Sequence, residues 1–499
     1  MNGLTNYDRV WASTLDKQDV DVMMDRIANG WSMAENHVFQ FDFLNDDFSK
    51  CPEELQEILN DPEKRKKLVI YINPPYAEAA NARTSSGTGT NRQGVSESRI
   101  RNNYGDELGR AVNELFAQFF ARVVKEINGS ILAVFSKLKT LQGPNFVGFR
   151  RNFSAKLSRI FLMPANTFDN VKGQFPIGFQ IWQTSQKEDF ESICADVFDA
   201  KGEKQGCRNI FAYKNEKYLI HWIRNFYDKE NEHIAYLRFL GTDFQNNNGV
   251  FLTRTPSDND LKQVKGNWVT KQNIMPMSIY FAVRHCIEAT WLNDRDQFLY
   301  PNDGWLKDKE FQTNCLIYTL FHGQNRITAQ QGINHWIPFT REQVGCRKTF
   351  KSTFMSDYLN GKIKTENLSG NLFGFQQDSI QHELSEMDHE LSKNGIYDNS
   401  CEIHGNSCNK IIDCMSPEAQ AVYDAGLALW RYYHTQPNAI ADASYYDIRL
   451  HFQGTNDKGN MNAKSDDATY TALITDSREK MKILANRIEP KVYEYGFLK

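Results

Sequence analysis

The chain has 499 residues, a formal net charge of −4 and nine cysteines. This length predicts roughly two to four domains, and the near-neutral charge excludes a generally basic surface, so any nucleic-acid contact must be a local patch. No apolar run is long enough to predict a membrane span. The odd cysteine count, without a secretion signal at the start, predicts reduced thiols and a cytoplasmic location.

Two short strands are expected near the start of the chain. Apolar patterning predicts one over residues 9–15 and a second over 38–44, where apolar and other residues alternate. Asp16 follows the first strand and is placed to cap a helix formed around residues 20–27. Asp42 lies near the end of the second strand, just before a polar turn, and a solvated turn acid is one interpretation of it.

The most informative segment is Asn73-Pro74-Pro75-Tyr76, which follows the strand-like run 68–72. The side-chain oxygen of Asn73 and the carbonyl of Pro74 can both accept hydrogen bonds, and the two prolines hold the backbone stiffly. Tyr76 can stack on an aromatic ring. Two acceptors that grip an amino group would draw its lone pair out of conjugation and make the nitrogen nucleophilic. The simpler interpretation is a Pro-Pro turn that ends a strand.

The elements after this segment alternate between strand and helix. A polar loop is expected over 77–105; it is either a surface loop or a lid that orders over a ligand. It holds four arginines: Arg83, Arg92, Arg99 and Arg101. A helix is predicted over 107–127, and strands over 130–135, 160–162 and 177–182. The alternation predicts an α/β fold with a doubly wound sheet.

One stretch of the chain is basic. No Asp or Glu occurs between Ile127 and Phe168, while six basic residues do. They are Lys137, Lys139, Arg150, Arg151, Lys156 and Arg159. Such a stretch suits contacts to the phosphates of double-stranded DNA, although a solvated basic helix face is the alternative.

The tetrapeptide at 73–76 resembles motif IV of the amino-methyltransferases, above all the N6-adenine DNA methyltransferases. The resemblance covers residues 10–182 and implies an incomplete Rossmann-like sheet that uses S-adenosylmethionine. It implies that Asn73 and Pro74 bind the amino group of a flipped adenine, that Pro75 stiffens the segment, and that Tyr76 stacks on the base.

Other roles follow from the same resemblance. Asp42 would hold the adenosyl base with Phe43 as an apolar wall, and Asp16 would bind the ribose, although the family usually places an acid directly at that strand end. In the turn 168–176, Phe168 and Phe175 would touch the flipped base, with core packing as the alternative.

The family's glycine-rich cofactor loop, of the Phe-x-Gly-x-Gly kind, has no counterpart in this chain. We therefore expect the chain to be the carboxyl-terminal portion of a larger or split enzyme, and a partner polypeptide to supply the loop. The first rival hypothesis is a non-enzymatic DNA-binding subunit or truncated remnant. The second is a methyltransferase that acts on glutamine amides in protein, because an amide NH2 fits the same two acceptors.

The second half of the chain is expected to be organised differently. We predict a partial catalytic domain over 1–190, an irregular strand-rich segment over 191–275, with strands at 218–223 and 249–252, and a mainly helical domain over 276–499. Within the last, helices are predicted from Ser416-Pro417 and through Ile488 to Pro490.

The region from 281 to 497 resembles the carboxyl-terminal part of large single-chain restriction–modification methyltransferases, and its position suggests target recognition. Side chains of 322–326 and 334–336 can read base edges or can be buried core. Cys401, His404, Cys408 and Cys414 have donors that zinc accepts, but their spacing matches no familiar site, and we predict no metal.

Overall fold

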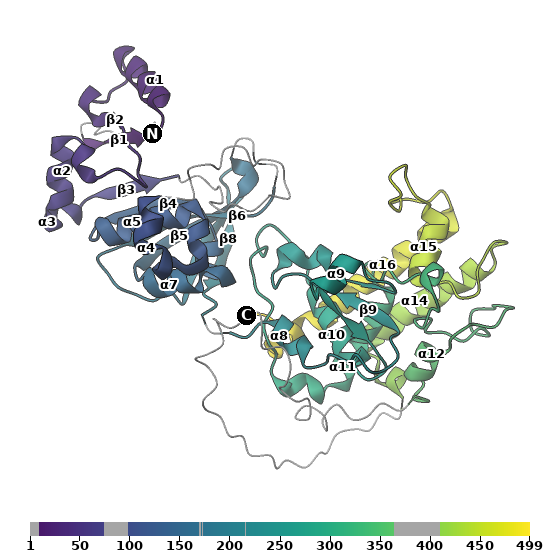
Figure 1. Ribbon diagram of the computed structural model, residues 1–499. Coiled ribbons are helices and arrows are strands. Elements are labelled where there is room, and N and C mark those ends of the chain that lie inside the picture. The colour runs from purple at the N-terminus through teal and green to yellow at the C-terminus, as the bar shows by residue number, and fades with distance from the viewer. Residues whose placement is uncertain (1–8, 74–97, 169–170, 172, 215, 364–409) are drawn as a thin grey trace, which may run out of the picture. The chain divides into compact units, whose positions relative to one another are not determined.

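The computed structural model describes residues 9–73, 98–168, 171, 173–214, 216–363 and 410–499. The chain forms two compact units (Figure 1). The first holds residues 1–215 with 290–295, and the second holds 216–289 with 296–499. Both contain helices and sheets, so the fold is mixed α/β, as predicted.

The first unit begins with a two-stranded parallel sheet. Its strands are β1 (Ala12–Thr14) and β2 (Val38–Gln40), shorter than expected, and they are joined by α1 (Lys17–Ala28). Helices α2 (Glu53–Asn60) and α3 (Pro62–Arg65) follow. Apolar residues after β2 pack against α2, around Phe41, Cys51 and Leu59.

A six-stranded sheet forms the body of this unit, in the order β3-β4-β6-β5-β7-β8. Strands β3 and β4 are parallel, as are β5 and β7, while β6 runs antiparallel to both β4 and β5. The strands are β3 (Val69–Ile72), β4 (Ile131–Lys137), β5 (Lys156–Pro164), β6 (Pro176–Gln183), β7 (Ser192–Phe198) and β8 (Lys204–Phe211). Because β7 and β8 belong to this sheet, the unit extends past the expected boundary at residue 190.

Helices α4 (Arg99–Leu108), α5 (Leu115–Glu126), α6 (Lys139–Gln142) and α7 (Val147–Asn152) complete the unit. In Figure 1, α4, α5 and α7 lie together on one side of the sheet. They bury alternate strand residues such as Leu132, Val134 and Leu162 in one apolar cluster.

Two predictions about these helices were wrong. The single helix expected over 107–127 is divided, because Gly109 adopts a φ of 54° that ends α4, and a 3₁₀ turn follows before α5 begins. The loop expected over 77–105 ends earlier than proposed, because Ser98 caps α4 through the backbone N–H of Arg101. Arg99 and Arg101 are therefore helical, whereas Arg83 and Arg92 lie outside the described residues.

The second unit has a small antiparallel sheet in the order β10-β9-β11, surrounded by helices. Its strands are β9 (Ala235–Arg238), β10 (Phe251–Thr253) and β11 (Gly266–Val269). Its helices are α8 (Leu219–Arg224), α9 (Asp258–Lys262), α10 (Ile274–His285), α11 (Lys309–Phe321), α12 (Phe354–Leu359), α14 (Pro417–His434), α15 (Tyr445–Gln453) and α16 (Ala468–Glu494). The strand expected over 218–223 is wrong, because this segment forms α8 and buries Leu219, Trp222 and Ile223 on one side.

The core of the second unit lies around α10 and α11, where every residue from Ile274 to Arg284 and from Phe311 to Phe321 is buried. Helix α14 starts at the predicted Ser416 cap and approaches α11 closely, since Gly426 leaves no room for a side chain against Phe321. The last helix continues past Pro490 to Glu494. In the described part of the chain, no helix has the length and apolar character that crossing a membrane requires.

Candidate functional site

The candidate site lies where the parallel strands β3 and β4 end. Ile72, the last residue of β3, pairs with Val134, so Asn73 follows at the level of Phe135. Asn73 is exposed at this strand end, and ligands of open α/β sheets bind beyond the carboxyl ends of strands. The rest of the predicted catalytic segment, Pro74, Pro75 and Tyr76, lies outside the described residues.

A row of aromatic rings crosses the sheet beside Asn73. Tyr71 of β3 contacts Phe135 and Phe179, with ring centroids 6.4 and 6.3 Å apart, and Phe179 contacts Phe161 at 5.1 Å. Phe161 in turn meets Phe198 of β7 at 5.7 Å. We call Tyr71, Phe135, Phe179, Phe161 and Phe198 the aromatic row. Tyr71 is 59% exposed, and the other four are half-buried.

The two residues predicted to touch a target base lie against this strand end. Phe168 packs edge-on against Phe135, with centroids 5.3 Å apart. Phe175 lies beneath Lys137 at the end of β4, with the Lys137 nitrogen 5.4 Å from the ring centroid. The structure thus places Phe168, Phe175 and Lys137 at the end of the strand that neighbours β3. Their contact with a base remains a prediction.

Asp42 belongs to a tight turn after β2. Its Oδ1 accepts hydrogen bonds from the backbone N–H groups of Leu44 and Asn45 at 2.9 and 3.2 Å, and its Oδ2 accepts one from the Asn45 side chain at 2.8 Å. This geometry matches the turn interpretation left open by the sequence. The predicted role of Asp42 toward an adenosyl base is not tested by these contacts.

Phe43 and the turn around it are fixed to helix α5 by a buried arginine. Phe43 stacks on Phe119 with centroids 5.3 Å apart. The guanidinium of Arg122, which is 0% exposed, donates to the backbone carbonyls of Phe43 and Asp46 and forms an ion pair with Glu126. Burial lowers the pKa of Arg122, while Glu126 opposes the shift. Sequence patterning did not reveal this arginine, because it is one charge among apolar residues of an amphipathic helix.

Asp16 serves as the cap of α1, since its side chain accepts a hydrogen bond from the backbone N–H of Gln18 at 2.9 Å. This confirms the capping interpretation. Its proposed contact with a cofactor ribose stays a prediction.

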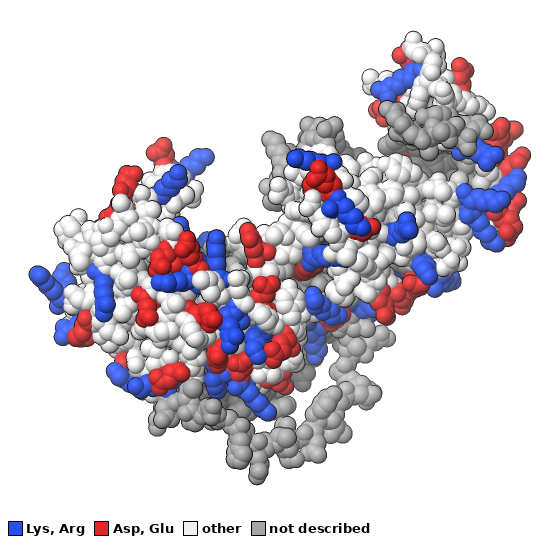
Figure 2. Space-filling view, turned by 180° about the vertical axis from the view of Figure 1, so that it is seen from behind, with Lys and Arg blue, Asp and Glu red and all other residues white. Residues whose placement is uncertain are grey.

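The six basic residues predicted to contact DNA do not form one uniform patch. Lys139 pairs with Glu114 at 2.7 Å and Lys156 with Glu188 at 3.3 Å. The guanidinium of Arg150 donates to the carbonyls of Thr140, Gly143 and Tyr213, so it holds this unit together. Arg151 and Arg159 are exposed. On the face seen in Figure 2, basic and acidic side chains are interspersed.

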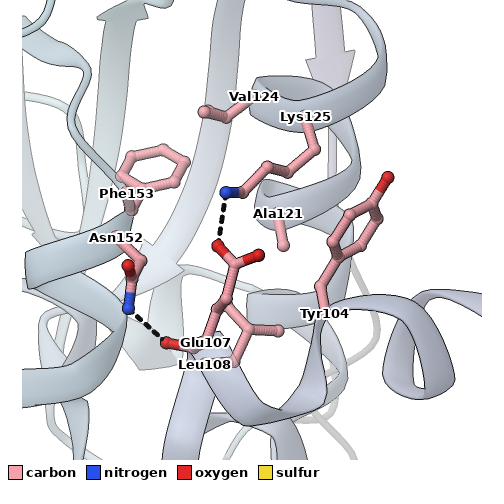
Figure 3. Close-up of a pocket in the computed structure, with 8 residues that line it drawn as sticks. All are labelled: Tyr104, Glu107, Leu108, Ala121, Val124, Lys125, Asn152 and Phe153. Atoms are coloured by element: carbon pink, nitrogen blue, oxygen red, sulfur yellow. Dashed lines mark hydrogen bonds and ion pairs between the residues drawn. The ribbon is translucent and has the colours of Figure 1, made fainter.

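Two cavities of the first unit are lined by other residues. The pocket in Figure 3 is formed by α4, α5 and α7 and holds about 10 Å³, space for about one water molecule. An ion pair between Glu107 and Lys125 lies across it. A larger open hollow of about 490 Å³ is lined by Asn36, Phe39 and residues 50–54. Neither is lined by a residue predicted to bind cofactor or base.

The candidate zinc residues are largely outside the described part of the chain. Cys414 lies in a 3₁₀ turn, whereas Cys401, His404 and Cys408 are not described. Among the described residues, no group of three or more His, Cys, Asp or Glu side chains could hold a metal ion.

The amino-terminal part of this unit has open sheet edges and exposed apolar side chains. In the described residues, β1 pairs only with β2, and β3 pairs only with β4. Helix α1 has no buried residue. All the large apolar side chains that are markedly exposed in the described part of this unit belong to this region, namely Leu15, Val22, Val69 and Tyr71.

Comparisons with known proteins give limited results. No family model matches the sequence, and no curated protein matches it. Two solved structures show local similarity to this chain. A DrdV–DNA complex has 14% sequence identity and a TM-score of 0.25; the match covers 39% of this chain and 21% of that chain. The ATP-dependent Type ISP restriction–modification enzyme LlaBIII bound to DNA has 12% identity and a TM-score of 0.28, with 56% and 22% covered. The chain spans about a fifth of the length of each.

Proposed function

We propose that this chain is the amino-group-binding part of a DNA adenine N6-methyltransferase of a restriction–modification system. The observation that carries the proposal is the position of Asn73. It follows the parallel strand β3, level with Phe135 on β4, and Phe168 and Phe175 gather at the end of β4. A polar acceptor beside aromatic rings at a carboxyl strand end suits a flat base that carries an amino group.

The chemistry asked of this chain is the activation of the amino group. The side-chain oxygen of Asn73 and the carbonyl oxygen of Pro74 accept hydrogen bonds from its two N–H groups and localise the lone pair on nitrogen. Tyr76 stacks on the base. Because N6 of adenine cannot be reached inside the duplex, the base must be flipped out.

The methyl donor in this proposal is S-adenosylmethionine, which supplies the transferred methyl group when bound. Asp42 and Asp16, the acids proposed to contact it, accept hydrogen bonds within their own turn and helix cap. Their contact with the cofactor stays a proposal.

The proposal assigns the missing cofactor contacts to a partner polypeptide that carries the glycine-rich loop. In the residues that the structure describes, β1 and β3 each pair along one edge only, which supports this assignment, since a sheet edge presents N–H and C=O groups that a further strand can satisfy. The exposed Val69 and Tyr71 support it as well, because large apolar side chains on a sheet face favour a surface that a partner covers.

The same open edges favour one rival function. If no partner completes the sheet, the chain is a DNA-binding subunit without catalytic activity. An experiment must therefore test cofactor binding and methyl transfer separately from DNA binding.

The test uses the full chain with and without the polypeptide encoded next to it. Calorimetry measures S-adenosylmethionine binding, and transfer of a labelled methyl group to a random-sequence duplex pool measures activity. We expect both in the completed form only. Asn73→Ala should lower methyl transfer by at least about 100-fold, because the amino group loses an acceptor, while cofactor binding is retained.

Asn166→Ala, at an exposed position after β5, is the matched control and should keep full activity. Absence of cofactor binding in both forms, with duplex binding retained, would select the non-enzymatic subunit. Absence of both kinds of binding would remove the proposed function altogether.

A further inference from the structure

The small sheet of the second unit is wider than its three strands. Residues 324–326 run parallel to β10. The backbone N–H of Leu252 donates to the carbonyl of Gln324 at 3.1 Å, and that of Arg326 donates to the carbonyl of Leu252 at 2.9 Å. The segment 322–326 thus contributes a short added edge to this sheet. From the sequence, its side chains could either read bases or pack in the core.

Alternation along this edge divides its residues between two faces. Asn325 is 4% exposed and donates to the carbonyls of Thr319 and Leu320 at the end of α11, so its role is structural. Gln324 and Arg326 lie on the opposite face and are half-buried. Residues 334–336 are all buried, which favours the core alternative for them.

Arg326 is held in a defined position on the outer face. Its guanidinium carbon lies 4.0 Å from the ring centroid of Phe251. Its Nε and one Nη both donate to the side-chain oxygen of Gln324, at 2.9 and 2.6 Å. Within the described residues, its other Nη has no hydrogen-bond acceptor, and neither has the side-chain nitrogen of Gln324. These two nitrogens, which we call the outer fork, therefore remain as hydrogen-bond donors for a ligand.

Two further arginines lie near this fork. Arg238, on the same sheet face, forms an ion pair with Asp260 at 2.9 Å. Arg449 of α15 donates to the carbonyl of Gly323 at 3.0 Å. In the described part of the chain, neither Arg326 nor Arg449 has a carboxylate within ion-pair distance. Burial lowers the pKa of Arg326, and the charge of Arg238 acts in the same direction, so an electron-rich ligand would be favourable here.

We propose that Phe251, Gln324, Arg326 and Arg449 form a base-reading surface for duplex DNA. In the major groove, an arginine fork fits O6 and N7 of guanine, and the free amide nitrogen of Gln324 can donate to an acceptor on an adjacent base edge. Arg449 is placed to contact a phosphate. A guanidinium already fixed by stacking and an amide loses less freedom on binding than a mobile one.

This inference rests on the proposed function, for which it supplies the recognition surface. The test selects binding sites for the full chain from a random duplex library and measures affinity for the selected site by fluorescence anisotropy. We expect the wild-type chain to select a site that contains guanine. Arg326→Ala and Arg326→Lys should lose the preference at that one position, with affinity for the selected site falling by about 5- to 150-fold.

Arg341→Ala is the matched control, because Arg341 is an exposed arginine of the same unit whose one ion pair among the described residues is with its neighbour Glu342. It should keep the selected site and affinity. The lysine variant keeps the charge at this position, so a folding defect in the alanine variant does not decide the result.

Three outcomes would overturn the inference. If the Arg326 variants select the same site with unchanged affinity, the base-reading role fails while duplex binding by the chain stands. If they weaken all sequences equally and reduce the salt dependence, Arg326 contacts phosphate and reads no base. If the wild-type chain binds no duplex, the inference and the proposed function fail together.

Discussion

Each unit contains a fully buried arginine that holds a loop, but the two surroundings differ. Arg122 in the first unit donates to the carbonyls of Phe43 and Asp46 and also meets Glu126. Arg284 in the second unit donates to the carbonyls of Leu240, Gly241 and Asp243 and to the side chain of Asn247. Both are 0% exposed, and both lie over a phenylalanine ring, Phe48 or Phe298.

The difference lies in what surrounds each of these two loop-holding arginines, which we call clamps. The loop held by Arg122 follows the short strand β2, in a region with open sheet edges and an α1 that buries nothing. The loop held by Arg284 connects β9 and β10 and packs on the core of the second unit through Phe244, while Gln245 and Asn248 are exposed. A buried arginine that donates to backbone carbonyls thus fixes a loop on the core of the second unit. In the first unit it fixes a loop in a region with open sheet edges.

The largest expected effect is the loss of these clamps. Arg284→Leu should lower the free energy of unfolding by about 3–5 kcal/mol, because it leaves several buried acceptors without a donor. Arg122→Leu should cost less, about 2–3 kcal/mol, since Glu126 keeps its ion pair with Arg99 and water can reach the turn. Urea unfolding measures both. Arg110→Leu, at an exposed position, is the control; equal losses at Arg122 and Arg284 would contradict the comparison.

A second difference concerns pH, because the second unit holds a partly buried pair of histidines. His285 and His322 stack with centroids 4.6 Å apart. Burial lowers the pKa of His322 to about 3, with Arg449 acting in the same direction, and burial lowers that of His285 well below its usual value, with His322 adding to the shift. Both are neutral in the folded state, whereas unfolded histidines take up protons near pH 6.5.

The stability contribution of this pair is therefore complete above about pH 6.5 and is lost as the pH falls below it. We expect the free energy of unfolding to fall by about 1 kcal/mol per histidine for each pH unit below about pH 6. Urea unfolding at about pH 7.5 and about pH 5.5 measures this dependence. His322→Gln should reduce the slope, and an unchanged slope would argue against the assignment.

The smallest effect on stability is expected at the open sheet of the first unit. Val69 is 56% exposed on β3, and Ile483 is 55% exposed on α16. Replacing either by lysine should change the stability of the chain alone by less than about 1 kcal/mol. Val69→Lys should nevertheless weaken binding of the proposed partner polypeptide by at least about tenfold, whereas Ile483→Lys should not. Pull-down of the partner measures this difference.

Local sequence patterns predicted individual helices and strands better than they predicted which elements pack together. The strands over 130–135, 160–162 and 177–182 and the start of α14 at Ser416 are present as expected. Alternation failed over 218–223, where a short apolar run fits a strand or one side of a helix equally well. Periodicity also missed the break at Gly109, because a helix can end without any change in its apolar pattern.

The sequence by itself determined that an amide acceptor and two rigid prolines follow an apolar strand, because this depends on residue types and short spacing alone. Only the tertiary structure decided what faces that strand end. The sheet order brings Phe135, Phe161 and Phe179 into one row from strands far apart in the chain. The tertiary structure also places the neighbours Asn325 and Arg326 differently. Asn325 is buried in the core, whereas Arg326 stacks on Phe251. Neighbours in space depend on strand pairing and burial, which no local pattern encodes.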